Sequence, residues 1–339
     1  MSSIEFIAEN TDSVRLDSYA ATVQGISRSR LKNGLEKLEV NGKAVKLSYK
    51  LKEGDKVFIQ WDDPIPEKIE AQNIPLSIIY EDNAVCVVDK KQGMVTHPGS
   101  GNMKNTLVNA LMFHRGQDGF TLDDNTNEIG LRAGICHRLD KDTSGVIITA
   151  KDIESESFLQ EQFKERRTQK EYIAIVQGHP PQYSGTIKTQ IERSPRNRKL
   201  FSVTDDKTRG KFAHTNYRCV AIYGQYSLLK LQIKTGRTHQ IRVHMKHLGC
   251  PILGDPLYGK KDVLFPNSTL KLHARSLGIR LPPNSVVDES FFAAENSAVY
   301  KSEDIENFVY FTAKTPVHFR KIMKVLHEKF EKTNFRTRY

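Results

Sequence analysis

The segment Ile135–Lys151, ICHRLDKDTSGVIITAK, places a charged turn directly before an uninterrupted β-branched run. Val146–Thr149 has the length and composition of a short, fully buried strand, and Asp142–Gly145 has the chemistry of a turn leading into it. The scaffold therefore holds the Asp140 carboxylate at the mouth of a buried strand. Arg138, two residues earlier, is placed to keep this carboxylate ionised. By itself, such a pattern is more often a structural Arg–Asp pair than a functional one.

Four ordered motifs point away from the structural interpretation. HRLD, followed by TSG and an aliphatic strand, resembles the motif of the RluA-type pseudouridine synthases, which isomerise uridine in structured RNA. Three further segments resemble that family in the same order: Lys170–Gly178 (KEYIAIVQG), Thr235–Met245 (TGRTHQIRVHM) and Gly254–Gly259 (GDPLYG). Four motifs in order are far more specific than one, and the resemblance covers about residues 76–280.

The resemblance implies that Asp140 is the catalytic aspartate. The reaction breaks the bond between uracil N1 and ribose C1′, turns the base and rejoins it through C5, without a metal, a redox agent or a nucleotide cofactor. It needs a carboxylate against the ribose, a pocket for the freed base and a group that handles the C5 proton. Attack on C1′ and removal of the C2′ proton both remain open. Asp142, the nearest rival, occupies a variable motif position and is interpreted as a turn-capping residue.

Two further residues have competing interpretations. Tyr172 opens an apolar strand, where an aromatic side chain usually packs in the core. The resemblance instead implies an active-site tyrosine whose ring stacks on the base and whose hydroxyl transfers a proton. Arg138 is similar to a family arginine associated with extrusion of the target nucleotide, a step that costs a few kcal/mol. The alternative is that Arg138 only tethers Asp140.

The segment Gln240–His244 alternates polar and apolar residues, which predicts an extended stretch with one apolar face. Arg242 then faces inward and needs a partner, for which an anionic Asp140 is the simplest choice. We therefore expect Arg242 to pair with the catalytic carboxylate. Arg237 and His239 are expected to be neighbouring contacts that bind RNA or shape the loop.

The composition indicates a basic cytoplasmic protein with a polyanionic partner. The 339 residues carry a net charge of +11, which favours nucleic acid. Four scattered cysteines indicate neither disulfides nor a zinc ribbon. No targeting segment, membrane span or phosphate-binding glycine loop is recognised, which argues against methyltransferases, helicases and kinases. Three possible metal ligands occur at three-residue spacing: His244, His247 and Cys250. No fourth ligand accompanies them, so we expect no metal site.

Residues 1–62 have the pattern of a small separate module. Val14–Val23 is expected to form a helix that Gly25 ends. A second helix is expected to begin at Ser27 or Ser29. Its apolar stripe would use positions i, i+4 and i+7, which are Leu31, Leu35 and Leu38.

The hairpin signal Val40–Lys43 (VNGK) follows, because Asn-Gly accepts the positive φ angles of a tight turn. This helix–helix–hairpin layout resembles the small S-four-type RNA-binding domain. A basic helix beside a basic hairpin is suited to follow a phosphate backbone, whereas the alternative is a solvated face without a partner. The expected RNA contacts are Arg28, Arg30, Lys32 and Lys43.

Beyond residue 76, short β-rich runs mix with helical stretches without a repeated βαβ unit. We therefore expect an α+β catalytic domain with a mixed, largely antiparallel sheet. The expected strands are Ser77–Tyr80, Val85–Asp89, Val146–Ala150, Tyr172–Gln177 and Ser227–Lys234. The expected helices are Asn105–His114 and Glu154–Arg166.

The domain boundaries follow from composition. Two prolines and several charges favour a linker over residues 63–75, since proline cannot pair in a central ladder. The catalytic domain is expected over residues 76–328 and a basic tail over 329–339.

Three segments are expected to be loops. Gly116–Ala133 is polar and leads into the first motif, and Pro282–Asn307 has no assigned role. Ser194–Lys211 contains six Lys or Arg residues and has the pattern of a projecting arm that grips RNA. The alternative for this arm is a solvated loop without a partner.

Together these features predict a cofactor-independent RNA pseudouridine synthase that acts on large-subunit ribosomal RNA. A transfer-RNA substrate is the alternative within the class. From a different class, the alternative is a non-catalytic RNA-binding or ribosome-assembly factor, which the intact set Asp140, Tyr172 and Arg242 disfavours. Nothing in the sequence demands a dimer, so a monomer is expected.

Overall fold

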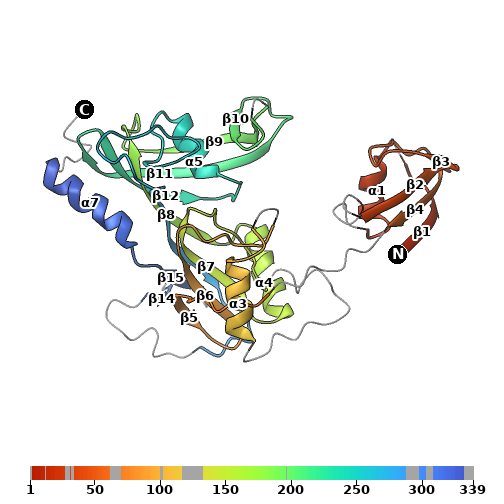
Figure 1. Cartoon of the computed structure of the whole chain (residues 1–339), viewed down its shortest axis with the longest axis horizontal. Helices are drawn as coiled ribbons and strands as arrows, with labels where there is room; N and C mark the ends of the chain where they lie inside the picture. Colours follow the sequence, from red (N-terminus) through yellow and green to blue (C-terminus); the bar gives the residue numbers. More distant parts are fainter. Residues whose placement is uncertain are drawn as a thin grey trace. The chain divides into compact units, whose positions relative to one another are not determined.

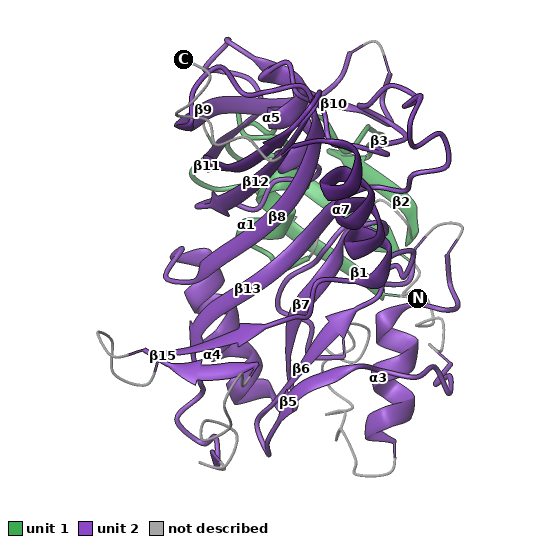
Figure 2. Cartoon of the chain, turned by 90° about the vertical axis from the view of Figure 1, so that its left-hand side faces the viewer, with its two compact units in different colours: residues 1–68 green, residues 69–339 purple. Residues whose placement is uncertain are grey.

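The computed structural model (Figure 1) describes residues 2–11, 13–26, 31, 34–61, 70–99, 102–116, 133–195, 197–287, 298–302 and 308–331. The chain forms two compact units, Met1–Lys68 and Ile69–Tyr339 (Figure 2). The division falls inside the segment 63–75. Each unit has a hydrophobic core of its own.

The first unit is a four-stranded antiparallel sheet with one described helix, α1 (Leu16–Thr22), in the expected place. The strand order is β1-β4-β2-β3, with β1 at Ser2–Ile7, β2 at Leu35–Val40, β3 at Lys43–Ala44 and β4 at Lys56–Trp61. The predicted hairpin is confirmed, because Val40 pairs with Lys43 and both turn residues have positive φ, Asn41 at 52° and Gly42 at 74°.

The prediction of a second helix is wrong at Leu35 and Leu38, which lie in strand β2, although Leu31 and Gly34 are helical. A β-bulge between Leu35 and Lys37 inserts one extra residue opposite β4. Leu35 and Leu38 therefore lie on the same side of the sheet although they are three residues apart, which imitates helical spacing. Three of the expected RNA contacts in this region, Arg28, Arg30 and Lys32, lie outside the described residues.

The second unit is built on one large mixed sheet, which confirms the predicted fold class. Its main path is β10-β9-β11-β12-β8-β13-β7-β6-β5, with β15 also paired to β13 and β14 to β15. Only the β13–β7 pair is parallel among the described strands. The bounds are β5 Ile78–Glu81, β6 Val85–Lys90, β7 Ser144–Ala150, β8 Gln169–Gln177, β9 Ser184–Arg193, β10 Phe201–Thr204, β11 Lys211–Tyr223, β12 Tyr226–Ile233, β13 Leu272–Arg280, β14 Val299–Lys301 and β15 Phe308–Thr312.

The strand after the first motif lies deep in the sheet, as predicted. All seven residues of β7 are buried between β6 and β13. Gly145 has φ +119°, and a Cβ at this position would collide with the backbone of Ala274 on β13. Glycine is therefore required where these two parallel strands approach. This close approach holds the turn containing Asp140 against the centre of the sheet.

Helices cover the sheet at four described places. The predicted helices correspond to α3 (Leu107–Arg115) and α4 (Ile153–Lys164), and α5 (Gln240–His247) and α7 (Val317–Lys329) complete the set. Among the described residues, no helix is long and apolar enough to cross a membrane.

The prediction of an extended Gln240–His244 segment is wrong, because these residues open helix α5. Residues two apart on a helix point in nearly opposite directions. Ile241 packs in the large central core, whereas Val243 packs in a separate cluster with Tyr258. Both sides of the helix are buried, so apolar residues occur in alternation without forming a strand.

The three segments expected to be loops fall partly outside the described residues. The basic arm Ser194–Lys211 contains the short strand β10, which pairs with β9. Pro282–Asn307 contains strand β14, so its prediction as a continuous loop is wrong. Residues 117–132, 288–297, 303–307 and 332–339 are not described, and these include most of Gly116–Ala133 and of the expected tail.

Candidate active site

The turn that carries Asp140 is anchored by hydrogen bonds on both sides. The Thr96 hydroxyl donates to the Leu139 carbonyl at 2.9 Å, and the Thr143 amide donates to the Asp140 carbonyl at 3.1 Å. The Asp140 side chain keeps 20% of its surface exposed. The carboxylate is therefore fixed in position yet open to a substrate.

A buried lysine ties this turn to the end of β6. The ammonium group of Lys90 donates to the carbonyls of Lys91 at 3.1 Å, Met94 at 2.8 Å and Lys141 at 3.2 Å. Burial lowers the pKa of Lys90 to about 8, although the charges of Asp140 and Asp142 act in the opposite direction. Lys90 therefore holds the carbonyl next to Asp140 and places a positive charge beneath the turn.

Arg242 contacts two carboxylates. Its Nε and Nη2 donate to the two oxygens of Asp255, each at 2.8 Å, and its Nη1 lies 3.6 Å from Oδ2 of Asp140. The side chains of Arg242 and Asp255 are 4% and 0% exposed. Burial alone would raise the pKa of Asp255, but hydrogen bonds and charge from Arg242 lower it below the usual value. The bidentate pair with Asp255 therefore fixes the guanidinium that faces Asp140.

Tyr172 and Asp140 line the same pocket, together with apolar side chains from β12, α5 and β13: Ile233, Ile241 and Leu272. Tyr172 is 8% exposed and belongs to the central core cluster. Burial raises its pKa, and the charge of Asp140 raises it further. Its hydroxyl is therefore protonated at neutral pH. Both interpretations of Tyr172 describe part of its surroundings, since the ring packs in the core and also borders the pocket.

The residue that directly precedes helix α5 faces Asp140. His239 has a left-handed backbone with φ 56°, and its Nε2 lies 3.9 Å from Oδ2 of Asp140. Its Nδ1 is 2.9 Å from the hydroxyl of Tyr258. Burial lowers the pKa of His239, while the charge of Asp140 opposes this shift. Arg237 also lines the pocket, and its Nε donates to the Phe212 carbonyl at 2.9 Å.

Arg138 lies at the rim of the pocket with an exposed side chain. Within the described part of the chain, it makes no ion pair with Asp140, so the alternative in which Arg138 tethers this carboxylate is not supported. The cation that faces Asp140 comes from Arg242, far along the sequence.

The expected RNA contact Lys43 is exposed on β3 of the first unit.

Sequence reasoning missed three residues that build the site: Lys90, Asp255 and Tyr258. The last two lie in the GDPLYG motif, which was recognised without a role. Tyr258 stacks under Arg242, with the guanidinium carbon 5.1 Å from the ring centroid. Arg242 was predicted to pair with Asp140. The available signal for Asp255 was a second carboxylate in a recognised motif, 13 residues after this buried arginine.

The three-residue series His244, His247 and Cys250 has another explanation. Both ring nitrogens of His244 are engaged by threonine hydroxyls, at 2.8 Å from Thr215 and 3.0 Å from Thr189. Burial lowers its pKa to about 4, so the ring is a neutral structural group.

Among the residues that the structure describes, one group has three potential ligand atoms close together: Glu81, Cys86 and His114. The Glu81 carboxylate is paired there with His114 and with Lys151, each at 2.9 Å. These contacts account for the cluster without a metal ion.

The buried pair leads to a stability prediction. Asp255→Asn is expected to lower the free energy of unfolding by about 3 kcal/mol, because it leaves the buried charge of Arg242 without its main partner. Urea unfolding measures this difference. Asp142→Asn is the matched control, since Asp142 has no ion pair in the described structure, and we expect a change within about 0.5 kcal/mol. Equal stability of Asp255→Asn and wild type would contradict the role of the pair.

Comparisons with known proteins agree with this geometry. Residues 84–247 match the family described as RNA pseudouridylate synthase. A ribosomal large subunit pseudouridine synthase D from Borreliella burgdorferi is 43% identical over 88% of this chain and 95% of its own length. A protein of the same name from Xanthomonas campestris is 41% identical over 75% of this chain and 73% of its own.

A solved structure has a similar fold. Human RNA pseudouridylate synthase domain containing 4 aligns with a TM-score of 0.54 and 23% identity, over 74% of this chain and 93% of its own. The family match and the sequence identity over most of the length of these relatives agree with each other. The chain therefore belongs to the RNA pseudouridylate synthase family and is an RNA pseudouridine synthase.

Proposed function

We propose that this enzyme isomerises uridine in large-subunit ribosomal RNA, with Asp140 as the catalytic carboxylate. The observation that carries the catalytic assignment is the single pocket lined by Asp140, Tyr172 and Arg242. The substrate assignment is supported by two relatives named as ribosomal large subunit pseudouridine synthases and by the net charge of +11. Action on ribosomal RNA implies a cytoplasmic location. All three residues come from one chain, so a monomer suffices.

The proposed chemistry begins when the target uridine leaves its stack. Its ribose then meets Asp140, which attacks C1′ or removes the C2′ proton as the bond to N1 breaks. Arg242 keeps the carboxylate aimed, because its guanidinium is itself held by Asp255. The freed uracil turns against Tyr172 and the apolar wall of the pocket. C5 then bonds to C1′ as the bond between Asp140 and C1′ breaks or, in the other route, as Asp140 returns the proton to C2′, and N1 takes a proton from solvent. The proton on C5 then leaves through the Tyr172 hydroxyl.

The rim of the pocket fits the extrusion step. Arg138 is exposed beside Asp140, where a planar cation meets the phosphates of a displaced nucleotide. Arg237 and His239 border the same opening, and we assign them to contacts with the flanking RNA.

Mapping of pseudouridine in cells that lack this protein tests the proposal. The expected result is loss of one or more pseudouridines in large-subunit ribosomal RNA, with restoration by the wild-type gene and not by Asp140→Asn. Loss of pseudouridine confined to transfer RNA would mean that transfer RNA, and not ribosomal RNA, is the substrate. An unchanged map in both RNAs would overturn the proposed function.

The first unit is proposed to bind RNA through its basic residues, among them Lys43. Removal of residues 1–68 should leave the second unit folded, because that unit contains its own core. Affinity for RNA should fall. The slope of the logarithm of the binding constant against the logarithm of salt concentration should flatten by about 3 if four cations each neutralise one phosphate. Filter binding at several salt concentrations measures both values. Identical slopes for the truncated and full chains would contradict contact between this unit and the RNA backbone.

A further inference from the structure

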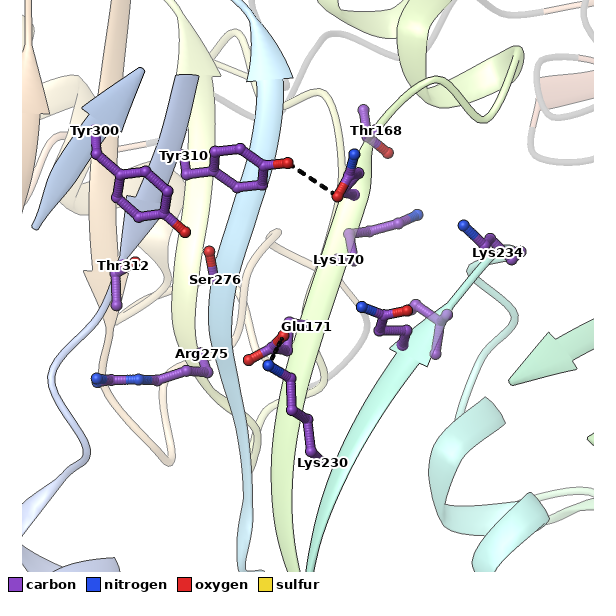
Figure 3. Close-up of a pocket in the computed structure, with 13 residues that line it drawn as sticks. Thr168, Lys170, Glu171, Lys230, Lys234, Arg275, Ser276, Tyr300, Tyr310 and Thr312 are labelled. Carbon is purple, nitrogen blue, oxygen red and sulfur yellow. Dashed lines mark hydrogen bonds and ion pairs between the residues drawn. The ribbon is translucent and has the colours of Figure 1, made fainter. Parts of the chain in front are cut away.

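A second pocket lies near the end of β12, on the face of the sheet opposite to the active-site side chains of Tyr172 and Leu272 (Figure 3). It lies over β8, β12 and β13 and is closed by β14 and β15. The two pockets share Ile233 as a wall, and Lys234, which lines the second pocket, directly precedes the loop 235–239 of the active site. An RNA with a uridine beside Asp140 would reach this pocket around the end of β12.

Two stacked tyrosines form one side of the pocket. The rings of Tyr300 on β14 and Tyr310 on β15 are 4.9 Å apart at an interplanar angle of 11°. The Tyr310 hydroxyl donates to Oε1 of Gln169 at 3.1 Å, and this hydrogen bond fixes the Tyr310 ring. Tyr300 is 48% exposed, so its other face is available to a further ring. Such a platform suits a nucleic-acid base of any sequence.

The opposite side of the pocket carries an excess of positive charge. The ammonium of Lys230 is neutralised by Glu171 at 2.6 Å. Lys170 and Lys234 have no carboxylate within ion-pair distance among the described residues, and their ammonium groups point toward one another in Figure 3. Lys170 is half-buried over the ring of Phe163, and burial lowers its pKa to about 8. An anion bound beside Lys170 would offset this desolvation.

Two hydroxyl groups in the pocket lack hydrogen-bond partners. The buried Oγ1 of Thr168 and Oγ of Ser276 bond to no described residue, and both side chains line this pocket. Buried polar atoms are normally satisfied. Two unsatisfied hydroxyls beside unpaired cations are thus consistent with a polar ligand.

We propose that this pocket binds a second nucleotide of the substrate RNA, outside the pocket that holds the target uridine. Its base stacks on Tyr300 and its phosphate lies between Lys170 and Lys234. The assignment rests on the proposed function, since the RNA is the one whose uridine enters the active site. It also gives a role to strand β14, which supplies Tyr300.

The proposal predicts an effect on affinity with little effect on chemistry. Tyr300→Ala should weaken binding of unmodified large-subunit ribosomal RNA about 10-fold, while Tyr300→Phe, which keeps the ring, should bind as wild type. Lys234→Ala should weaken binding and flatten the salt slope by about 1. Lys324→Ala on α7 is the matched control, because this lysine is 79% exposed and lies outside the pocket. Single-turnover rates at saturating enzyme should match wild type in all four variants.

Dissociation constants and saturating rates on the same RNA decide the outcome. Wild-type affinity in both Tyr300→Ala and Lys234→Ala would overturn the pocket assignment. A lower saturating rate with unchanged affinity would also overturn it, because it would mean that these residues only support the active site. If wild type binds ribosomal RNA but leaves its uridines unmodified, the proposed function fails, whereas the contrast between Tyr300→Ala and Tyr300→Phe still tests the pocket.

Discussion

Asp140→Asn is expected to reduce pseudouridine formation to background while RNA binding stays within about 2-fold of wild type. Asparagine is nearly isosteric, but its amide neither attacks C1′ nor takes a proton. The backbone hydrogen bonds of the turn do not involve the substituted group, so the loop should keep its conformation. Single-turnover assays on unmodified ribosomal RNA, together with a binding measurement, separate loss of chemistry from loss of affinity.

The neighbouring aspartate provides the control for this experiment. Asp142 belongs to the same turn, yet it lines the outer opening that Arg138 shares and lies outside the pocket containing Tyr172. Asp142→Asn is therefore expected to retain most of the wild-type rate. Turnover above background in Asp140→Asn, or its complete loss in Asp142→Asn, would move the catalytic role away from Asp140.

Local patterns predicted much of the second unit because its strands are buried and short. Val146–Ala150 reads as a continuous apolar run, and β7 is buried over its whole length. The same reasoning found the segments of β6 and β8 and the helices α3 and α4 within a few residues. These elements depend on burial and periodicity, which the sequence carries directly.

Errors arose where tertiary contacts override periodicity. Gln240–His244 alternates like a strand because α5 is buried on two sides, and Leu35 and Leu38 imitate a helix because of a β-bulge. In both cases, the apolar spacing is real but its geometric origin depends on neighbours distant in the sequence. A single sequence does not reveal these neighbours.

The candidate site was likewise predicted only in part. Asp140, Tyr172 and Arg242 were found from motifs, and they line one pocket. The prediction of one partner for Arg242 was incomplete, because a buried guanidinium has donors for two carboxylates and Asp255 takes the closer geometry. Lys90 escaped notice because its partners are backbone carbonyls, which leave no trace in the side-chain pattern.

Tyr172→Phe is expected to bind RNA normally and to lose about 100-fold or more in turnover. The ring and its packing survive in this variant, and only the hydroxyl is removed. General acid–base groups contribute about 10²–10⁴-fold, and the C5 proton must leave after the base is rejoined. Burial and the Asp140 charge raise the pKa of Tyr172. The hydroxyl must then act as a relay that accepts one proton while it releases its own, since a free phenolate is disfavoured at neutral pH.

Tyr172→Ala separates stacking from proton transfer. It should weaken RNA binding by about 1–3 kcal/mol through lost stacking and also lower stability, because Tyr172 is part of the central core. Thermal unfolding of both variants identifies the stability component. A wild-type rate in Tyr172→Phe would reduce Tyr172 to a stacking surface. A wild-type rate and affinity in Tyr172→Ala would leave Tyr172 only a role in core packing. The proton on C5 would then need another acceptor in the pocket, such as Asp140.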